Sequence, residues 1–112
     1  MRQHKEAHLK FIRSLPCIVC GDNTSTEAAH VRMSDPRIGK DITGIGIKPH
    51  DYFVVPLCGE CHRRQHQMSE RLFWRHAGID PVLKALALYA ASGDVDEADK
   101  ILNAVTNILA AG

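Results

Sequence analysis

Apolar and polar residues follow one another along this chain in patterns that predict helices at both ends and strands between them. Over residues 3–14, apolar side chains recur among charged ones at helical spacing, which predicts an amphipathic helix that ends before Pro16. Residues 27–31 are typical of a short strand, and the aromatic and β-branched residues at 52–56 give the strongest strand signal. We therefore expect two strands, separated by a long segment.

The last third of the chain has the periodicity of helices. One helix is expected over Ser69–His76 and a second over Asp80–Gly93, because capping residues and glycines mark their ends. Glu97 lies three residues after Asp94, which predicts the start of a last helix through Ala110. The apolar stripes of these helices favour packing on the rest of the domain, and a dimerisation or partner surface is the alternative.

Length and composition limit the class of protein. The chain has 112 residues, of which 45% are hydrophobic and 24% charged, and its formal net charge is +1. These values suit a small globular protein, and no apolar stretch approaches the roughly 18 residues that span a membrane. The N-terminus is basic but has no apolar core behind it, so it does not predict a secretory signal. We expect a cytoplasmic α+β protein with a core over residues 1–78 and a helical extension over residues 79–112 packed on that core.

The four cysteines form two Cys-x-x-Cys pairs, and 37 residues separate the pairs. A two-residue gap lets both thiolates of a pair reach one tetrahedral ion, and four sulfurs close its coordination sphere. Zinc would also supply the cross-link that so small a core lacks. Free buried cysteines or a redox pair are the alternatives, but no redox-type strand–helix context surrounds either pair. The sequence therefore predicts one structural Zn²⁺ site made of Cys17, Cys20, Cys58 and Cys61.

Two histidines follow the second cysteine pair in a predicted helix. His62 and His66 lie four residues apart, so they share one helix face and can share a metal ion. The spacing is like that of the His-Glu-x-x-His proteases, but position 63 is Arg, so the general-base glutamate of protease chemistry is absent. A divalent ion held by the two histidines could instead polarise a phosphate oxygen.

Two further polar residues belong to the same hypothesis. His30 lies on the first expected strand, and Asp51 precedes the second. A strand–loop–strand–helix arrangement, clamped by the cysteine pairs, would bring both residues beside the helix histidines. A neutral His30 could then deprotonate water, with Asp51 fixing its tautomer. The alternatives are a structural histidine at 30, a turn cap at 51, and a histidine face that only packs on the cysteine site.

The segment between the strands, residues 32–50, is long and contains several glycines and basic residues. Loops of such length in compact domains are usually functional or disordered. Basic side chains here and beside His62 could neutralise the phosphates of DNA, and solvated surface charge is the alternative. Because no base-reading motif is present, we expect little sequence specificity. The candidate phosphate contacts are Arg32, Arg37, Lys40, Lys48, Arg63 and Arg64.

The combined pattern is Cys-x-x-Cys … Ala-His-Val-Arg … Lys-Pro-x-Asp-x-x-x-Val-Pro-Leu-Cys-x-x-Cys-His-x-x-x-His. It resembles the HNH endonucleases of the ββα-metal fold, and more narrowly the phage recombination-enhancement nucleases and their phage and prophage relatives. The resemblance covers residues from about 8 to 80. It implies a DNA endonuclease with Mg²⁺, Mn²⁺, Ni²⁺ or Zn²⁺ as catalytic metal. It also implies His30 as general base, Asp51 near the central polar position, and His62 and His66 as metal ligands.

One position departs from the pattern of that family. Many members carry a metal-binding His or Asp immediately before the base, where this chain has Ala29. Either the site uses fewer protein ligands, or His30 is itself a ligand, or His8 or His50 takes the place. Two other functions therefore stand beside the nuclease. One is a non-catalytic zinc module that binds DNA or a recombination protein, and the other is a structural protein that binds a partner through its C-terminal helices.

Overall fold

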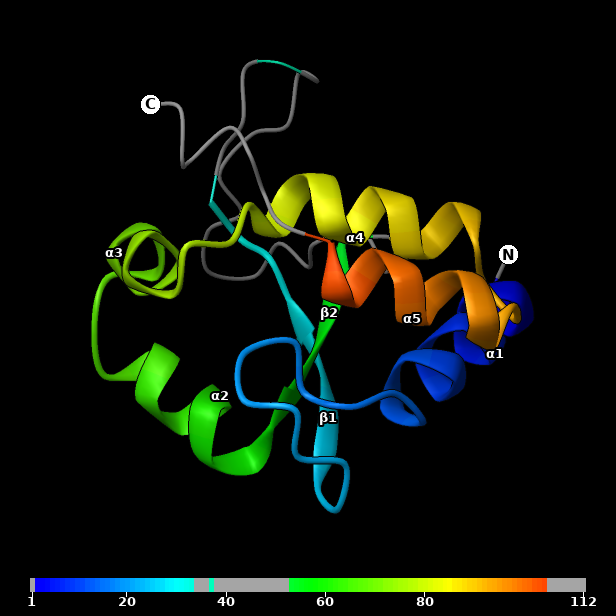
Figure 1. Cartoon of the computed structure of the whole chain (residues 1–112), viewed down its shortest axis with the longest axis horizontal. Coiled ribbons are helices and arrows are strands. Elements are labelled where there is room, and N and C mark those ends of the chain that lie inside the picture. Colours follow the sequence, from blue (N-terminus) through cyan, green and yellow to red (C-terminus); the bar gives the residue numbers. More distant parts are fainter. Residues whose placement is uncertain (1, 34–36, 38–52, 105–112) are drawn as a thin grey trace.

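The computed structural model describes residues 2–33, 37 and 53–104. Its fold is α+β, as the sequence predicts, with a two-stranded ribbon at the centre and helices around it (Figure 1). Among the helices that the structure describes, none is long and apolar enough to span a membrane. In chain order the elements are α1 (Arg2–Arg13), β1 (Thr26–His30), β2 (Val54–Cys58), α2 (Gly59–His66), α3 (Glu70–Ala77), α4 (Pro81–Ala90) and α5 (Val95–Asn103).

The two strands pair antiparallel, with Thr26 opposite Cys58 and His30 opposite Val54. Because side chains alternate across a strand, the two faces of the ribbon carry different residues. Both faces are covered, and every residue of β2 is buried, which explains why its sequence is apolar without alternation. One face joins a cluster that includes Ala29, Val55, Leu57, Phe73, Trp74 and Val82. Val54 on the other face packs with Ile12, Leu15, Leu88 and Ala98.

The helix starts follow the capping residues that the sequence contains. Ser69 accepts a hydrogen bond from the N–H of Leu72 at the start of α3. Asp80 and Asp94 accept equivalent bonds at the starts of α4 and α5. Gly78 ends α3 with the left-handed backbone that favours glycine, at a φ of 71°. The predicted starts of these helices are therefore confirmed.

The end of the last helix differs from the prediction. Helix α5 ends at Asn103, because Ala104 takes an extended backbone with a ψ of 137°. Buried Lys84 of α4 donates hydrogen bonds to the carbonyl oxygens of Ile101 and Ala104. A lysine donor at a helix C-terminus satisfies carbonyls that have no partner within the helix. The prediction that this helix runs through Ala110 is therefore wrong, because the helix already ends before Ala104. Residues 105–112 lie outside the described part.

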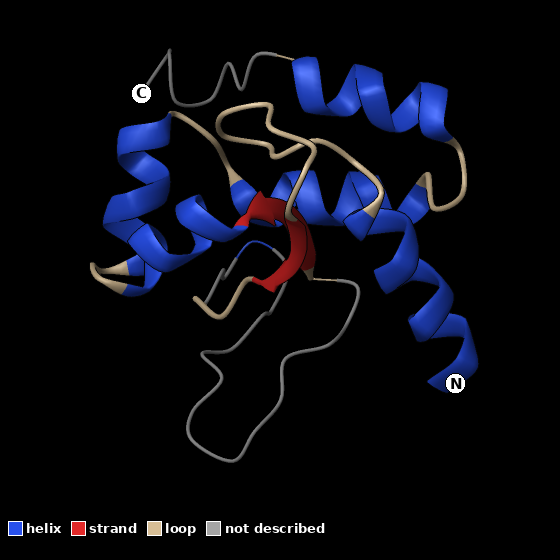
Figure 2. Ribbon diagram, turned by 90° about the horizontal axis from the view of Figure 1, so that it is seen from below, coloured by secondary structure: helices blue, strands red, loops and turns tan. Residues whose placement is uncertain are grey.

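Of the two C-terminal helices, α4 packs directly on the ribbon. Figure 2 shows the ribbon and the surrounding helices from a second direction. Helix α4 lies against β2 and α5 lies against α4. Val82 and Ala85 of α4 belong to the first apolar cluster, whereas Leu88, one turn further on, belongs to the second. Helix α4 therefore bridges the two clusters that the ribbon separates.

Candidate functional site

The two cysteine pairs, distant in sequence, meet at one end of the ribbon. Their four sulfur atoms all lie within 4.8 Å of one another. Cys20 Sγ and Cys58 Sγ are 3.7 Å apart, although 38 positions separate them in the chain. Four thiolate donors in this arrangement suit a tetrahedral metal site. The cysteine cluster that the sequence predicts is confirmed, and it can hold a metal ion.

Local backbone structure prepares both pairs for this role. In the first pair, the N–H groups of Val19 and Cys20 lie 3.4 and 3.5 Å from Cys17 Sγ. Gly21 closes that turn with a φ of 83°, and its N–H donates to the carbonyl of Cys17. In the second pair, Cys58 is the N-cap of α2, and its sulfur accepts a hydrogen bond from the backbone N–H of Cys61. Both turns thus aim backbone N–H groups at a sulfur atom.

Burial and hydrogen bonds shift the pKa values of three of the cysteine thiols in different directions. Burial raises the pKa of Cys17, but the N–H groups of Cys20, Cys58 and Val19 outweigh it and lower the pKa to about 7. Burial, followed by the neighbouring sulfurs, raises the pKa of Cys61. At Cys20 the N–H of Asp22 favours the thiolate, but burial and the adjacent thiols raise the pKa overall. The sulfurs therefore resist being charged together unless a cation compensates them.

The two helix histidines lie beside each other, one helical turn apart. The ring centroids of His62 and His66 are 4.7 Å apart, with an angle of 37° between the rings. His62 is half-buried and His66 is exposed. Because α2 begins immediately after Cys58, its first turn lies at the cysteine cluster. The shared helix face that the four-residue spacing predicts is present.

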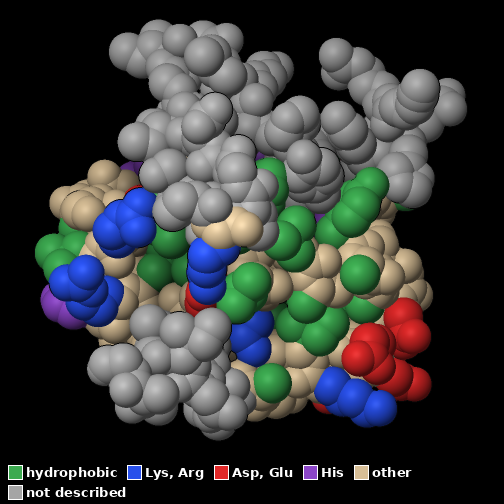
Figure 3. Space-filling model, turned by 90° about the horizontal axis from the view of Figure 1, so that it is seen from above, with side chains coloured by type: hydrophobic (Ala, Val, Ile, Leu, Met, Phe, Trp, Pro, Cys, Tyr) green, Lys and Arg blue, Asp and Glu red, His purple; other side chains and the backbone are tan. Residues whose placement is uncertain are grey.

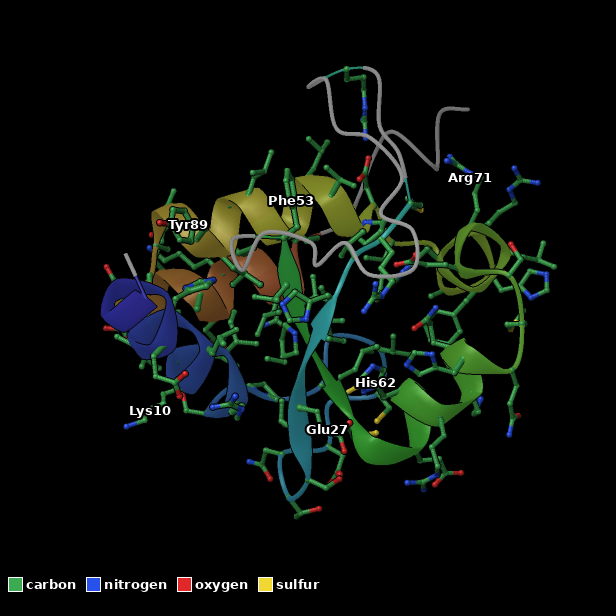
Figure 4. All side chains as sticks on the ribbon, turned by 180° about the vertical axis from the view of Figure 1, so that it is seen from behind. Lys10, Glu27, Phe53, His62, Arg71 and Tyr89 are labelled. Atoms are coloured by element: carbon green, nitrogen blue, oxygen red, sulfur yellow. The ribbon has the colours of Figure 1, made fainter. Side chains whose placement is uncertain are left out.

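Glu27 is a residue of this region that the sequence did not point out. Its Oε1 lies 2.6 Å from Nδ1 of His62, which links β1 to α2 (Figure 4). Glu27 pairs with Leu57, one position from the Thr26–Cys58 pair at the cysteine end of the ribbon. Strand alternation places Glu27 on the same face as Ala29. No local sequence pattern pointed to Glu27, because its partner His62 lies 35 positions later in the chain.

His30 occupies a different part of the ribbon. It is the last residue of β1, is half-buried, and pairs with Val54. Alternation places its side chain on the face of Val54, away from Ala29. Within the described ranges, the cysteines form the one group of three or more metal-ligating side chains that lie within 4.8 Å of one another. His30 does not form such a group with the helix histidines there.

His8, His50 and Asp51 are further candidate site residues that the sequence pointed to. His8 is buried, with its Nδ1 2.8 Å from Ser92 Oγ and its ring packed edge-on against Tyr89. Through these contacts, His8 helps to pack α1 against the end of α4. Asp51 and His50 lie outside the described residues.

The predicted phosphate contacts have different surroundings. Arg63 and Arg64 are exposed on α2. Arg32 is exposed, and its backbone N–H donates to the carboxylate of Glu70 at the start of α3. The guanidinium of Arg37 forms an ion pair with Asp80, so its charge is already compensated. Lys40 and Lys48 lie outside the described part of the chain.

The charges on one face of the molecule are unevenly distributed. Viewed from above, Lys and Arg side chains extend from the side of α3 to the middle of the face, whereas Asp and Glu side chains gather on the opposite side, toward α5, with a basic side chain beside them (Figure 3). In the sequence, α2 and α3 carry Arg63, Arg64, Arg71 and Arg75 beside Glu60 and Glu70, and α5 carries Asp96, Glu97 and Asp99 beside Lys100. The basic side is the one that continues from the histidine-bearing helix.

Most of the chain matches a known protein family. The family described as "Protein of unknown function (DUF968)" matches residues 1–91, which include the ribbon, the cysteine cluster and helices α1 to α4. The chain belongs to the DUF968 family. The DUF968 match thus contains all of the candidate site and excludes α5.

The chain is also similar to "Uncharacterized protein YdfU" of Escherichia coli (strain K12). It is 34% identical to this DUF968 chain over 64 residues, which are 55% of the chain and 16% of that protein. The matched part is thus about one sixth of that relative's length. No solved structure matches the chain.

Proposed function

We propose that this DUF968 chain is a metal-dependent DNA endonuclease of the HNH kind, acting in phage or prophage recombination, repair or DNA processing. The observation that carries the proposal is the neighbouring pair of His62 and His66 on the helix that directly follows the ribbon and the cysteine cluster. The order β1–β2–α2 supports it, because the ββα-metal unit that the sequence pattern resembles has this order of elements. The biological setting comes from that resemblance alone.

The cysteine cluster is assigned to a structural Zn²⁺. Four protein sulfurs would fill a tetrahedral coordination sphere and leave no position for substrate or water. The site joins the segment before β1 to the start of α2, so a bound ion would cross-link the ribbon to the helix that carries the histidines. Its contribution is then to folding and to the position of α2.

The histidine pair is assigned to the catalytic metal. Imidazole donors suit Ni²⁺ or Zn²⁺ better than Mg²⁺ or Mn²⁺, which prefer oxygen ligands. When bound, a divalent ion supplies the polarisation of a phosphate oxygen. His62 and His66 hold the ion, and their proximity fits this role. Two imidazoles do not complete a coordination sphere, so water and the phosphate itself would occupy the remaining positions.

His30 is assigned the role of accepting a proton from the attacking water, with Asp51 fixing its tautomer. A half-buried position at the last residue of β1 keeps the imidazole accessible to solvent. Because the side chain leaves the ribbon on the face away from Ala29, the phosphate would have to lie at the end of the strand, where both faces can be reached.

DNA is the proposed substrate because exposed arginines lie on the same helix as the histidines. Arg63 and Arg64 follow His62 directly and would contact phosphates on either side of the cleaved bond. Arg32, Lys40 and Lys48 extend the same role to the segment between the strands. Arg37 contributes less, since its charge is compensated by Asp80.

The test is a plasmid-nicking assay on the zinc-loaded chain with added Mn²⁺, Ni²⁺ or Mg²⁺. The variants are His62→Ala, His66→Ala and His30→Ala, and the matched control is His76→Ala, an exposed histidine on α3. The site variants should lose nicking by about 100-fold or more while zinc content and helical signal stay unchanged. The control should cut like the unmodified chain, and a fully active His30→Ala would remove that residue from the mechanism.

A non-catalytic zinc module that binds DNA or a recombination protein is the second candidate. The observation that favours it is the buried Ala29 at the position where many HNH proteins carry a metal ligand. Within the described residues, the group of three or more mutually close metal-ligating side chains is the cysteine cluster, and the histidine pair is not part of such a group. This candidate predicts salt-sensitive retention of DNA in a gel-shift assay without cleavage in any divalent metal.

A further inference from the structure

We infer that Glu27 is a positioning residue for the metal site of α2, because it holds the His62 imidazole in the orientation that leaves Nε2 for the ion. The inference rests on the proposed function, since it presumes that His62 is a metal ligand. It adds to that function a residue that neither the sequence pattern nor the family match assigns.

The contact between Glu27 and His62 is short and joins two different elements. Glu27 Oε1 lies 2.6 Å from His62 Nδ1, within the distance of a charge-assisted hydrogen bond. The side chain of His62 is 22% exposed and that of Glu27 is 53% exposed. The imidazole is thus sheltered while the carboxylate reaches it from the solvent side. A neutral His62 donates its Nδ1 proton to the carboxylate, which leaves the lone pair on Nε2.

The position of Glu27 in the strand explains how the contact is held. Glu27 lies next to the Thr26–Cys58 pair, and Cys58 is also the N-cap of α2. Strand and helix therefore diverge from one point, the cysteine cluster. The Glu27–His62 contact bridges them one helical turn from that point. A structural ion at the cluster would fix both ends of this bridge.

Glu27 acts as a support and not as a third ligand. Its carboxylate, His62 and His66 do not form a group of ligand atoms within 4.8 Å of one another, whereas the four cysteines do. The oxygen nearest to His62 is engaged with Nδ1, so it approaches the ring on the side away from Nε2. Metal-ligating histidines commonly donate their second ring N–H to a carboxylate, which fixes the tautomer and raises the basicity of the ligand.

Gly59 leaves the space that this carboxylate needs. A methyl group at Gly59 would lie 3.3 Å from Glu27 Oε2 and 3.4 Å from Arg63 Nη1. The second carboxylate oxygen and the guanidinium therefore border the same small space beside the first turn of α2. A larger side chain at position 59 would therefore crowd the carboxylate that contacts His62.

The experiment measures binding of Co²⁺ to the zinc-loaded full chain by calorimetry and by the visible absorption of the bound ion. Glu27→Ala should weaken Co²⁺ affinity 10- to 100-fold, the range found when a supporting partner of a metal ligand is removed. Glu27→Gln, which keeps an acceptor oxygen but no charge, should fall between that variant and the unmodified chain. The matched control is Glu60→Ala, an exposed acidic residue of the same helix.

Two comparisons separate this inference from the proposed function. If His62→Ala and His66→Ala abolish Co²⁺ binding while Glu27→Ala leaves it unchanged, the site stands and the role of Glu27 is overturned. If the two histidine variants bind Co²⁺ like the unmodified chain, the proposed metal site itself fails. A lower melting temperature of Glu27→Ala with unchanged Co²⁺ affinity would reduce the contact to a structural ion pair and would also overturn the inference.

Discussion

The carboxylate of Asp80 serves two partners at once, because Oδ2 lies 3.0 Å from the guanidinium of Arg37 and Oδ1 accepts the N–H of Leu83 at the start of α4. Asp80 is buried, whereas nearly half of the Arg37 side chain is exposed. One side chain therefore caps the helix that bridges the two apolar clusters and also ties residue 37, in the segment between the strands, to that helix.

Substitutions at Asp80 should separate these two roles. Asp80→Ala removes both and should lower the free energy of unfolding by about 1–2 kcal/mol, the usual cost of a lost N-cap. Asp80→Asn keeps a good capping residue but loses the charge, so it should cost less than about 1 kcal/mol. Urea unfolding followed by circular dichroism measures both. Equal losses in the two variants would show that the cap contributes nothing.

Loss of one cysteine should unfold much of the protein. Cys58→Ala removes a sulfur from the cluster and the N-cap of α2 in one change. Because metal binding would be coupled to folding, zinc should be lost and the melting temperature should fall by about 10 °C or more. Elemental analysis and thermal denaturation check this, with Thr24→Ala, an exposed residue of the nearby turn, as the control. A Cys58→Ala protein that retains its melting temperature would argue against a structural metal.

Lys84 should stabilise the contact between α4 and α5. Lys84→Met keeps the length of the side chain but removes the donors to Ile101 and Ala104, at a cost of about 1–3 kcal/mol for the carbonyls left without them. Lys100→Met, an exposed residue of α5, is the matched control and should be nearly neutral. Hydrogen exchange should show faster opening of α5 in the first variant only, and equal protection in both would contradict the role of Lys84.

The stability of the unmodified chain should also carry a pH dependence from Lys84. Burial lowers the pKa of Lys84, so the unfolded chain binds more protons than the folded one between the lowered value and 10.5. Stability from this group therefore rises as pH increases through that window. The difference in unfolding free energy between the chain and Lys84→Met should change in the same window. If this difference in unfolding free energy did not change with pH, burial of the Lys84 charge would not destabilise the fold.

The arginines of α2 should set the salt dependence of DNA binding. The double substitution Arg63→Gln/Arg64→Gln removes up to two phosphate contacts, so the slope of log affinity against log salt should fall by about two. The control is Lys10→Gln/Arg13→Gln on α1, which carries the same change of charge away from the histidines. Equal slopes for the two double variants would show that α2 does not contact the phosphates.

Local signals in the sequence predicted much of the fold. Ser69, Asp80 and Asp94 mark helix starts through side-chain hydrogen bonds within three residues, so the chain itself contains the information. The cysteine spacing similarly predicted one cluster. The second strand begins at Val54, later than its aromatic and β-branched residues suggest, because strand bounds depend on pairing with β1.

The remaining features depend on contacts between distant parts of the chain. Glu27 has no unusual neighbours in sequence, and its importance appears only when folding brings His62, 35 positions later, to its carboxylate. The end of α5 likewise depends on Lys84, a residue of another helix. The face of the ribbon on which His30 lies depends on the register between β1 and β2, and no local sequence pattern specifies that register.

The measurement that tests the account most directly is the metal content of the purified chain, before and after mild chelation and again after addition of Mn²⁺ or Co²⁺. We predict about one tightly held zinc per chain from the four-cysteine cluster. We also predict a second, exchangeable ion that is lost in His62→Ala and His66→Ala and whose return restores plasmid nicking. A chain that retains zinc but binds no second ion and never nicks DNA would contradict the nuclease proposal, and a chain without zinc would contradict the structural site.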